Sequence, residues 1–164
     1  MEENRTPDTL TQREVMGPAE VGEALGRLTD EVLRRCPHDP LLVGIPTRGV
    51  YLARRLSEAL RRRGVEAPVG VLDITLYRDD LRSDPALPVT HKTHIPFSIS
   101  RRTVVLVDDV IHTGRTVRAA LDALMNIGRP RAVRLAVLVD RGGRELPIQP
   151  DFLGARVEAA PQEE

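Results

Sequence analysis

The 164-residue sequence has few sulfur-containing and aromatic side chains and no excess of one charge. Its single cysteine, Cys36, excludes internal disulfide bonds and thiolate zinc clusters. Two Tyr, two Phe and no Trp are too few for the stacking platforms of proteins that bind single-stranded RNA or DNA. Because 24 basic residues balance 24 acidic ones, the net charge gives no argument for a nucleic-acid or membrane surface, although a local basic face is compatible with this balance.

The sequence also lacks long apolar runs. No stretch approaches the roughly 20 apolar residues of a membrane-spanning helix. The N-terminal stretch MEENRTPDTLTQREV has no apolar core of the length found in signal peptides. We therefore expect a soluble, cytoplasmic protein with no membrane partner. The composition, 41% hydrophobic and 29% charged, fits a single domain at residues 15–158, between a disordered N-terminus at 1–14 and a polar tail at 159–164.

Apolar strands and amphipathic helices alternate along the chain. The hydrophobic spacing predicts helices over residues 18–36, about 52–64 and 117–128. Short aliphatic runs predict strands at residues 41–45, 68–77, 103–110, 134–140 and 152–158. Strands that are apolar on both faces and alternate with helices are typical of α/β proteins. We predict an open, mostly parallel sheet with helices on both faces.

Each of the first four predicted strands runs directly into a polar cluster. These clusters are GIPTRG, TLYRDD, DDVIHTGRT and DRGGR. The carboxyl ends of parallel strands share one edge of a sheet, and ligands bind there in open α/β folds. The sequence therefore predicts a ligand site at this edge.

The stretch VVLVDDVIHTGRT carries the most specific chemistry. A buried strand delivers Asp108 and Asp109 to the sheet edge, and Thr113, Gly114 and Thr116 follow where a helix begins. Free N–H groups and the positive end of the helix dipole favour a phosphate at such a turn. Carboxylates accept hydrogen bonds from sugar hydroxyls. The spacing therefore predicts a ribose 5-phosphate, with the acids on its 2- and 3-hydroxyls and the loop on its 5-phosphate.

Two competing phosphate motifs are absent from the sequence. There is no GxxxxGK[ST] P-loop, and no GxGxxG follows a strand. The simpler alternative is that Asp108 and Asp109 only end a strand and that Thr113 only caps a helix.

The stretch also resembles the phosphoribosyl-pyrophosphate signature of type I phosphoribosyltransferases. Together with VGIPTRGVYLARRL, LDITLYRDDL, GRP and LAVLVDRGGRELPI, it resembles the family of bifunctional pyrimidine operon regulatory proteins and uracil phosphoribosyltransferases over about residues 40–157. The resemblance implies the type I phosphoribosyltransferase fold. It implies transfer of ribose 5-phosphate from phosphoribosyl pyrophosphate to uracil, giving UMP and pyrophosphate, with Mg²⁺ held by the substrate and no direct protein ligand. It further implies a homodimer or higher homo-oligomer.

The resemblance also assigns roles to individual residues. Catalysis is expected of Asp108, Asp109 and Arg78. Binding of phosphoribosyl pyrophosphate or nucleotide is expected of Thr47, Arg48, Gly49, Asp108, Asp109, Val110, Ile111, His112, Thr113, Gly114, Arg115 and Thr116. The positions that match residues framing the base or the diphosphate are Val139, Asp140, Arg141 and Val157.

Some of these assignments have simpler alternatives. The TRG stretch would hold pyrophosphate through backbone N–H groups and a guanidinium fork, but a lone TRG is also typical of an ordinary turn. Arg78 begins a long irregular segment and would close over the leaving group, or it pairs with Asp79 and Asp80 in solvent. His112 stands where relatives have Tyr or Phe, and purine-salvage enzymes have Asp. Three roles are therefore open for its imidazole. It donates a hydrogen bond to a carbonyl of the base, it transfers a proton, or it only fills the space of the aromatic side chain.

The family's regulatory members bind a leader mRNA hairpin, dependent on uridine nucleotide, and so attenuate transcription of pyrimidine genes. This chain lacks cations that relatives carry at several positions, which are Gly22, Glu23, Asp30, Pro46, Gly143 and Gln149. Because phosphate neutralisation supplies much of such affinity, we expect weak, salt-sensitive RNA binding. Two alternatives to a uracil enzyme follow: an RNA-binding regulator with little catalysis, or a purine phosphoribosyltransferase.

Overall fold

The computed structural model describes residues 14–79 and 92–157. Asp80 and the two predicted polar ends, except Glu14, lie outside these ranges. The described helices are α1 (Pro18–Arg35), α2 (Arg48–Arg62) and α3 (Arg115–Ile127), with a 3₁₀ turn η1 at Thr75–Tyr77. The described strands are β1 (Leu41–Gly44), β2 (Val69–Val71), β3 (Thr103–Ile111), β4 (Ala132–Asp140) and β5 (Phe152–Arg156). Within these ranges, no helix is both long and apolar enough to cross a membrane.

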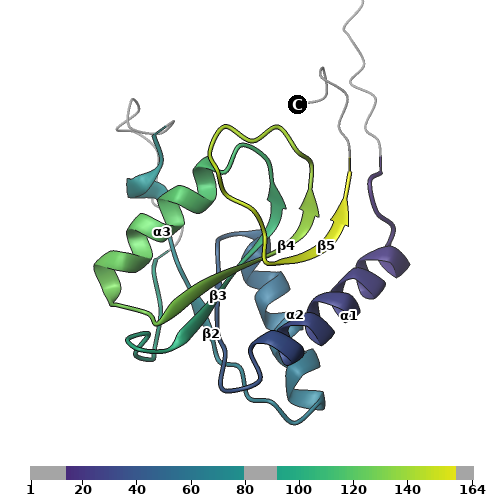
Figure 1. Ribbon diagram of the computed structural model, residues 1–164, viewed down its shortest axis with the longest axis horizontal. Coiled ribbons are helices and arrows are strands. Elements are labelled where there is room, and N and C mark those ends of the chain that lie inside the picture. Colours follow the sequence, from purple (N-terminus) through teal and green to yellow (C-terminus); the bar gives the residue numbers. More distant parts are fainter. Residues whose placement is uncertain (1–13, 80–91, 158–164) are drawn as a thin grey trace, which may run out of the picture.

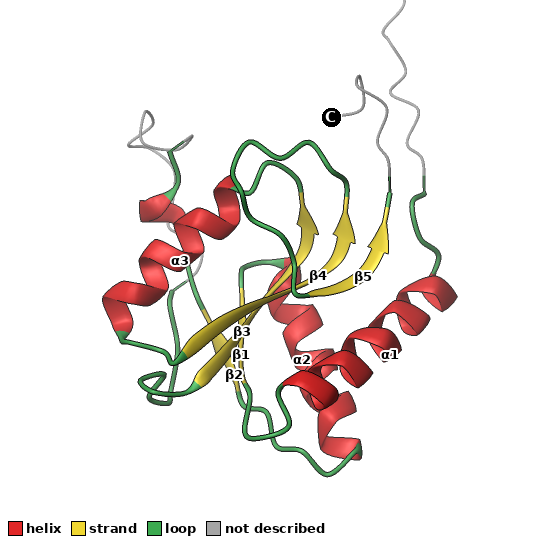
Figure 2. Ribbon diagram, viewed as in Figure 1, coloured by secondary structure: helices red, strands yellow, loops and turns green. Residues whose placement is uncertain are grey.

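The five strands form one sheet in the order β2-β1-β3-β4-β5, and every strand pair is parallel (Figure 1). Helices α1 and α2 cover one face of the sheet, and α3 covers the other (Figure 2). The predicted open parallel sheet with helices on both faces is therefore confirmed. The order places β1, which precedes the TRG stretch, next to β3, which contains the acid pair and leads into the 112–116 loop.

Alternate residues of the central strands enter opposite hydrophobic layers. Leu41 and Val43 of β1 pack in the layer of α3, together with Leu124. Leu42 packs in the layer of α1 and α2, together with Leu56. Because successive side chains of a strand point to opposite faces, a strand buried on both faces reads as an unbroken apolar run. This double burial fixes the carboxyl ends of β1 and β3 rigidly at one edge.

The strand predicted at 68–77 is shorter than expected. It ends at Val71, because the carboxylate of Asp73 accepts hydrogen bonds from the N–H of Thr75 at 2.9 Å and from its hydroxyl at 2.6 Å. Such local side-chain contacts compete with sheet pairing and bend the chain. The bend leads into η1. Val71 also pairs with His94 in an isolated antiparallel bridge.

Candidate functional site

The carboxyl ends of β1 and β3 open into a cleft of about 370 Å³. Its lining comes from three of the four predicted polar clusters and the chain beside them: Ile45, Pro46, Thr47, Asp73, Ile74, Thr75, Arg78, Asp108, Asp109, Val110 and Thr116. A second cavity of about 150 Å³ is also lined by Arg78 and Thr116, together with Asp79, Thr113 and Arg115. The predicted sheet edge thus brings these clusters to a common site.

Asp108 is the buried member of the acid pair. It is 7% exposed, and its carboxylate accepts a 2.8 Å hydrogen bond from the N–H of Asp109. Burial raises the pKa of Asp108 to about 8, and the negative charge of Asp109 adds to the rise, whereas that N–H group and the Arg78 cation oppose it. A ligand that donates hydrogen bonds or brings positive charge would favour the ionised form.

Asp109 has more contact with solvent and with cations. Its side chain is 27% exposed, it accepts from the N–H of Val110 at 2.9 Å, and it lies 3.5 Å from a guanidinium nitrogen of Arg48. The Arg48 side chain is 82% exposed, so its fork is accessible at the first turn of α2. The two carboxylates therefore differ in surroundings although they are neighbours in sequence.

The loop at residues 112–116 joins β3 to α3. Gly114 is the N-cap of α3 with φ +93°, in the left-handed region that glycine adopts without strain. The hydroxyl of Thr113 accepts from the N–H of Arg115 at 3.3 Å. Main-chain donors, two threonine hydroxyls and the start of a 13-residue helix thus occur together, which are the features of an anion site at a helix N-terminus.

The TRG stretch is packed tightly against β3. A Cβ atom at position 49 would collide with the carbonyl oxygen of Val107 and lie 3.1 Å from the Cα of Asp108, so only glycine fits there. The peptide bond between Pro46 and Thr47 is cis. Gly49 therefore lets α2 begin directly beside the acid pair, which explains this part of TRG better than an ordinary turn does.

The stem of the long predicted loop is fastened to α3. The carboxylate of Asp79 lies 2.7 Å from Arg118 and 3.8 Å from Arg115. The side chain of Arg115 also pairs with Glu145. These ion pairs connect Asp79 to the helix that follows the 112–116 loop. Arg78 itself lines both cavities.

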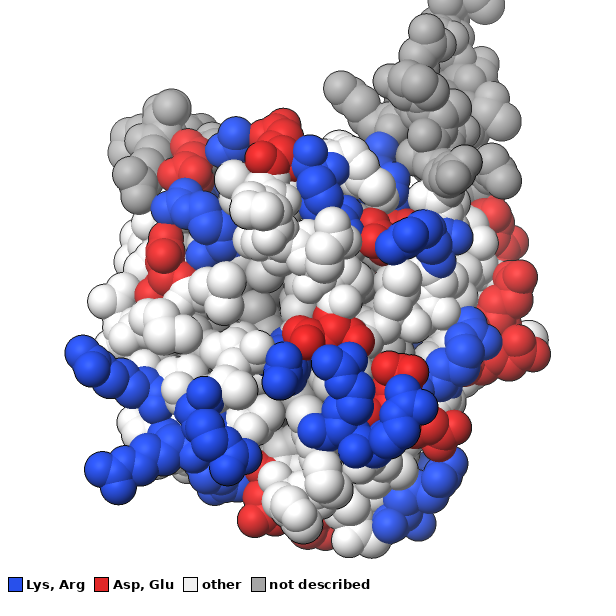
Figure 3. All heavy atoms as spheres, in the orientation of Figure 1, with Lys and Arg blue, Asp and Glu red and all other residues white. Residues whose placement is uncertain are grey.

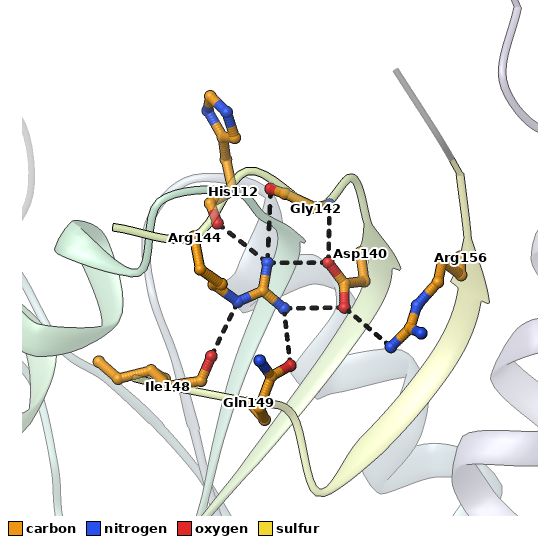
Figure 4. A network of polar contacts seen from close by, with 7 residues as sticks. All are labelled: His112, Asp140, Gly142, Arg144, Ile148, Gln149 and Arg156. Atoms are coloured by element: carbon orange, nitrogen blue, oxygen red, sulfur yellow. Dashed lines mark hydrogen bonds and ion pairs between the residues drawn. The ribbon is translucent and has the colours of Figure 1, made fainter. Parts of the chain in front are cut away.

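Other predicted site residues lie away from the two cavities. Ile111 is 2% exposed and belongs to the hydrophobic core. His112 is exposed, and its imidazole points away from the polar network below it (Figure 4). The N–H of Arg141 donates to the Ile111 carbonyl at 3.1 Å, and the N–H of Val157 donates to the Asp140 carbonyl at 2.9 Å. These hydrogen bonds align the ends of β3, β4 and β5.

Asp140 and Arg144 form a buried ion pair that sequence reasoning missed. Both guanidinium Nη atoms of Arg144 donate to the Asp140 carboxylate at 2.8 Å, and the Asp140 side chain is 3% exposed (Figure 4). The hydrogen bonds from Arg144, then the N–H of Gly142 and the nearby positive charges, hold the pKa of Asp140 below its usual range. The Asp140 carboxylate is thus occupied by protein donors.

Asp73 is a second residue that the sequence argument missed. It lines the cleft of about 370 Å³ together with the acid pair. A polar residue between Leu72 and Ile74 in an apolar run was the available signal. Among residues 14–79 and 92–157, no group of three or more His, Cys, Asp or Glu side chains is arranged to hold a metal ion.

The profile of the phosphoribosyl transferase domain family matches residues 19–157. The bifunctional protein PyrR of Enterococcus faecalis is 48% identical over 158 residues, covering 94% of this chain and 88% of the relative. The bifunctional protein PyrR of a Roseiflexus species is 52% identical over 151 residues, covering 90% of this chain and 82% of the relative.

Solved structures with a similar fold include purine enzymes. A hypoxanthine-guanine phosphoribosyltransferase from Bacillus anthracis has a TM-score of 0.70 at 14% identity, covering 89% of this chain and 82% of that one. A hypoxanthine phosphoribosyltransferase from Trypanosoma cruzi, in complex with the product IMP, has a TM-score of 0.60 at 17% identity, covering 85% and 70%. At such low identity these structures establish the type I phosphoribosyltransferase fold alone.

Proposed function

The chain belongs to the PyrR family of phosphoribosyltransferases, and from this membership we propose that it transfers ribose 5-phosphate from phosphoribosyl pyrophosphate to uracil. The products are UMP and pyrophosphate. The observation that carries the proposal is that Asp108, Asp109 and Thr116 line one cleft. An acid pair suited to the ribose hydroxyls and a helix start suited to the 5-phosphate thereby occur at one site.

The proposed reaction forms a bond between N1 of uracil and C1 of the ribose. The bond from C1 to the pyrophosphate oxygen breaks, and the N1 proton of the base passes to the departing pyrophosphate or to solvent. The ribose gains positive charge in the transition state and the leaving pyrophosphate gains negative charge, so positioning and electrostatic stabilisation supply most of the catalysis. Asp109 and ionised Asp108 would stabilise the ribose, whereas Arg48 and Arg78 would neutralise the pyrophosphate.

Members of this enzyme family work with Mg²⁺, and the cleft fits an ion that arrives with its substrate. Asp108 and Asp109 line the cleft and would face an ion that the substrate phosphates and water hold, with no direct protein ligand. We propose that the acid pair faces this ion. Bound there, the ion would supply countercharge to the pyrophosphate.

The base is proposed to lie beside the ends of β4 and β5. Val139, Asp140, Arg141 and Val157 are located there, and main-chain groups can recognise the edge of uracil without a dedicated side chain. His112 is exposed and is not among the residues that line the two cavities, which favours the interpretation that it only fills the place of an aromatic residue. We expect uracil rather than hypoxanthine as the substrate, because relatives of about 50% identity are PyrR proteins.

The direct test supplies phosphoribosyl pyrophosphate, Mg²⁺ and either uracil or hypoxanthine, and follows nucleotide formation by chromatography. We expect UMP from uracil. Asp109→Asn should lower kcat/KM by about 10- to 100-fold, since hydrogen bonds to charged groups contribute about 1.5–3 kcal/mol. Asp30→Asn, at an exposed position of α1, is the matched control and should leave the rate unchanged. Product from hypoxanthine alone would favour the purine alternative.

We also propose that the chain binds a leader mRNA hairpin and attenuates transcription, as a bifunctional family member, through a weakened basic face. The arginines of α1 are engaged within the protein: Arg34 pairs with Glu31, and Arg35 pairs with Asp151. Arg27 donates to the Gly154 carbonyl at 2.8 Å. Acidic side chains also lie beside basic ones on the surface along α1 (Figure 3). This charge mixture supports a regulator with weak, salt-sensitive RNA binding.

A further inference from the structure

The carbonyl groups of the 112–116 loop are held from outside by the loop at residues 142–149. The carbonyl oxygen of His112 accepts a 2.9 Å hydrogen bond from Nη1 of Arg144. The carbonyl oxygen of Thr113 accepts from the N–H groups of Glu145 at 2.9 Å and Leu146 at 3.1 Å. Two successive peptide groups of the 112–116 loop are therefore fixed by one neighbouring loop.

Because a peptide group is planar, these contacts to the carbonyl oxygens also fix the directions of the N–H groups that follow them. In a trans peptide, the C=O of one residue and the N–H of the next point in opposite directions. The hydrogen bond to the His112 carbonyl therefore turns the Thr113 N–H away from the 142–149 loop. The hydrogen bonds to the Thr113 carbonyl turn the Gly114 N–H away in the same manner. These are the donors of the proposed phosphate site.

Arg144 is the residue that holds the 142–149 loop in place. Besides the two bonds to Asp140, its guanidinium donates to the Ile148 carbonyl at 2.8 Å and to the Gln149 side chain at 3.2 Å (Figure 4). Gly142 and Gly143, with φ of +71° and +70°, turn the chain so that Arg144 returns to the end of β4. The Arg144 side chain is 14% exposed, and its donors are used inside the protein.

We propose that Arg144 is a positioning residue that aims the Thr113 and Gly114 N–H groups at the 5-phosphate of the substrate. It acts through the His112 carbonyl and through the 142–149 loop, without touching the substrate. Because preorganised donors bind an anion without reorganisation, loosening this support weakens phosphate binding. The inference rests on the proposed function, which places the 5-phosphate at the 112–116 loop.

The test measures binding of ribose 5-phosphate by calorimetry, because this probe carries the 5-phosphate but no pyrophosphate. In Arg144→Lys the charge beside Asp140 is kept, but one ammonium cannot reach both carboxylate oxygens and the His112 carbonyl. We expect its Kd for ribose 5-phosphate and its KM for phosphoribosyl pyrophosphate to rise about tenfold, the effect of about 1.4 kcal/mol. The KM for uracil should stay within about twofold of the wild-type value, since the misaligned N–H groups bind the 5-phosphate of phosphoribosyl pyrophosphate and not uracil.

Arg156→Lys is the matched control. Arg156 lies 3.5 Å from the same Asp140 carboxylate, but its contact is with that carboxylate and not with the 112–116 loop. We expect wild-type binding of ribose 5-phosphate in this variant. If thermal unfolding shows that Arg144→Lys is not folded, the double variant Asp140→Asn/Arg144→Gln replaces it, because it removes both members of the ion pair together. Only its Kd for ribose 5-phosphate is then compared with the wild type, since Asp140 lies on the side proposed for the base.

Each outcome has one meaning. Wild-type protein that fails to bind ribose 5-phosphate would contradict the proposed function itself. Wild-type binding together with unchanged binding in Arg144→Lys would overturn the role of Arg144 and leave the proposed function standing. Equal losses in Arg144→Lys and Arg156→Lys, or an equal rise of the KM for uracil, would also overturn it, since they indicate general loosening.

Discussion

The N–H of Asp109 donates a 2.8 Å hydrogen bond to the carboxylate of Asp108, so two consecutive acids lie in unlike surroundings at the end of β3. Asp108 is enclosed by the sheet, whereas Asp109 faces solvent and Arg48. Burial raises the pKa of Asp108 to about 8, so this carboxylate acquires its charge when a cation or a hydroxyl donor arrives.

The raised pKa of Asp108 predicts a stability that falls as pH rises. The folded state holds this proton more tightly than the unfolded state, so the stabilisation is complete below the usual carboxyl range and is lost as pH rises toward about 8. For one proton the slope is about 1.4 kcal/mol per pH unit. Thermal unfolding of Asp108→Asn across this window should show a flatter profile and a higher Tm at alkaline pH. An unchanged slope would contradict this prediction.

Asp140 predicts the opposite dependence of stability on pH. Its pKa is lowered in the folded state, so its contribution is present above the usual carboxyl range and is lost as pH falls through the lowered value. Asp140→Asn should cost about 3–5 kcal/mol at neutral pH, because Arg144 is left as an uncompensated buried cation. Urea unfolding at neutral and acid pH measures this difference, which should shrink on acidification. A constant difference would exclude the ion pair as its source.

Gly49→Ala tests the close approach of α2 to β3. The added methyl group would displace the backbone at Val107 and Asp108, costing about 1–3 kcal/mol and raising the KM for phosphoribosyl pyrophosphate. Gly22→Ala is the control, because no atom lies within 4 Å of its added Cβ and it lies inside α1. It should stabilise the protein by about 0.5–1 kcal/mol. Chemical denaturation reports both values, and equal effects would refute the steric argument.

The regulatory function predicts weak binding of a leader mRNA hairpin that weakens further with added salt. Glu23→Arg should strengthen this binding and steepen its dependence on salt concentration, because it adds a phosphate-neutralising cation to exposed α1. Glu66→Arg makes the same charge change in the turn before β2 and should have a smaller effect. Filter binding at several salt concentrations gives both slopes. Tight binding in the wild type that barely responds to salt would show that the basic face is intact.

The sheet edge was predictable because its signals are local and repeated. Burial of β1 and β3 on both faces produces unbroken apolar runs, and polar residues begin where these strands end. Gly114 and the threonines mark a helix start by their own backbone and side-chain preferences. The prediction of parallel strands then brought these residues together without further information.

The Asp140–Arg144 pair was not predictable in the same way. An Asp and an Arg four residues apart suggest contact on a helix, but here the chain between them is a loop. Their contact depends on two successive left-handed glycines, and glycine adopts either sign of φ with similar ease. The end of β2 was predicted wrongly for a related reason. The apolar neighbours of Asp73 favour strand pairing, but the turn that the Asp73 side chain forms with Thr75 competes with it.

The contact between α1 and β5 joins elements from opposite ends of the chain. Gly154 lies against Ala24, where an added methyl group would come within 3.1 Å, and Arg35 pairs with Asp151 while its guanidinium covers the Phe152 ring at 5.0 Å. Because β5 is synthesised long after α1, the part of α1 that packs against β5 stays uncovered until the end of the described chain has been made, although its contacts with α2 can form earlier.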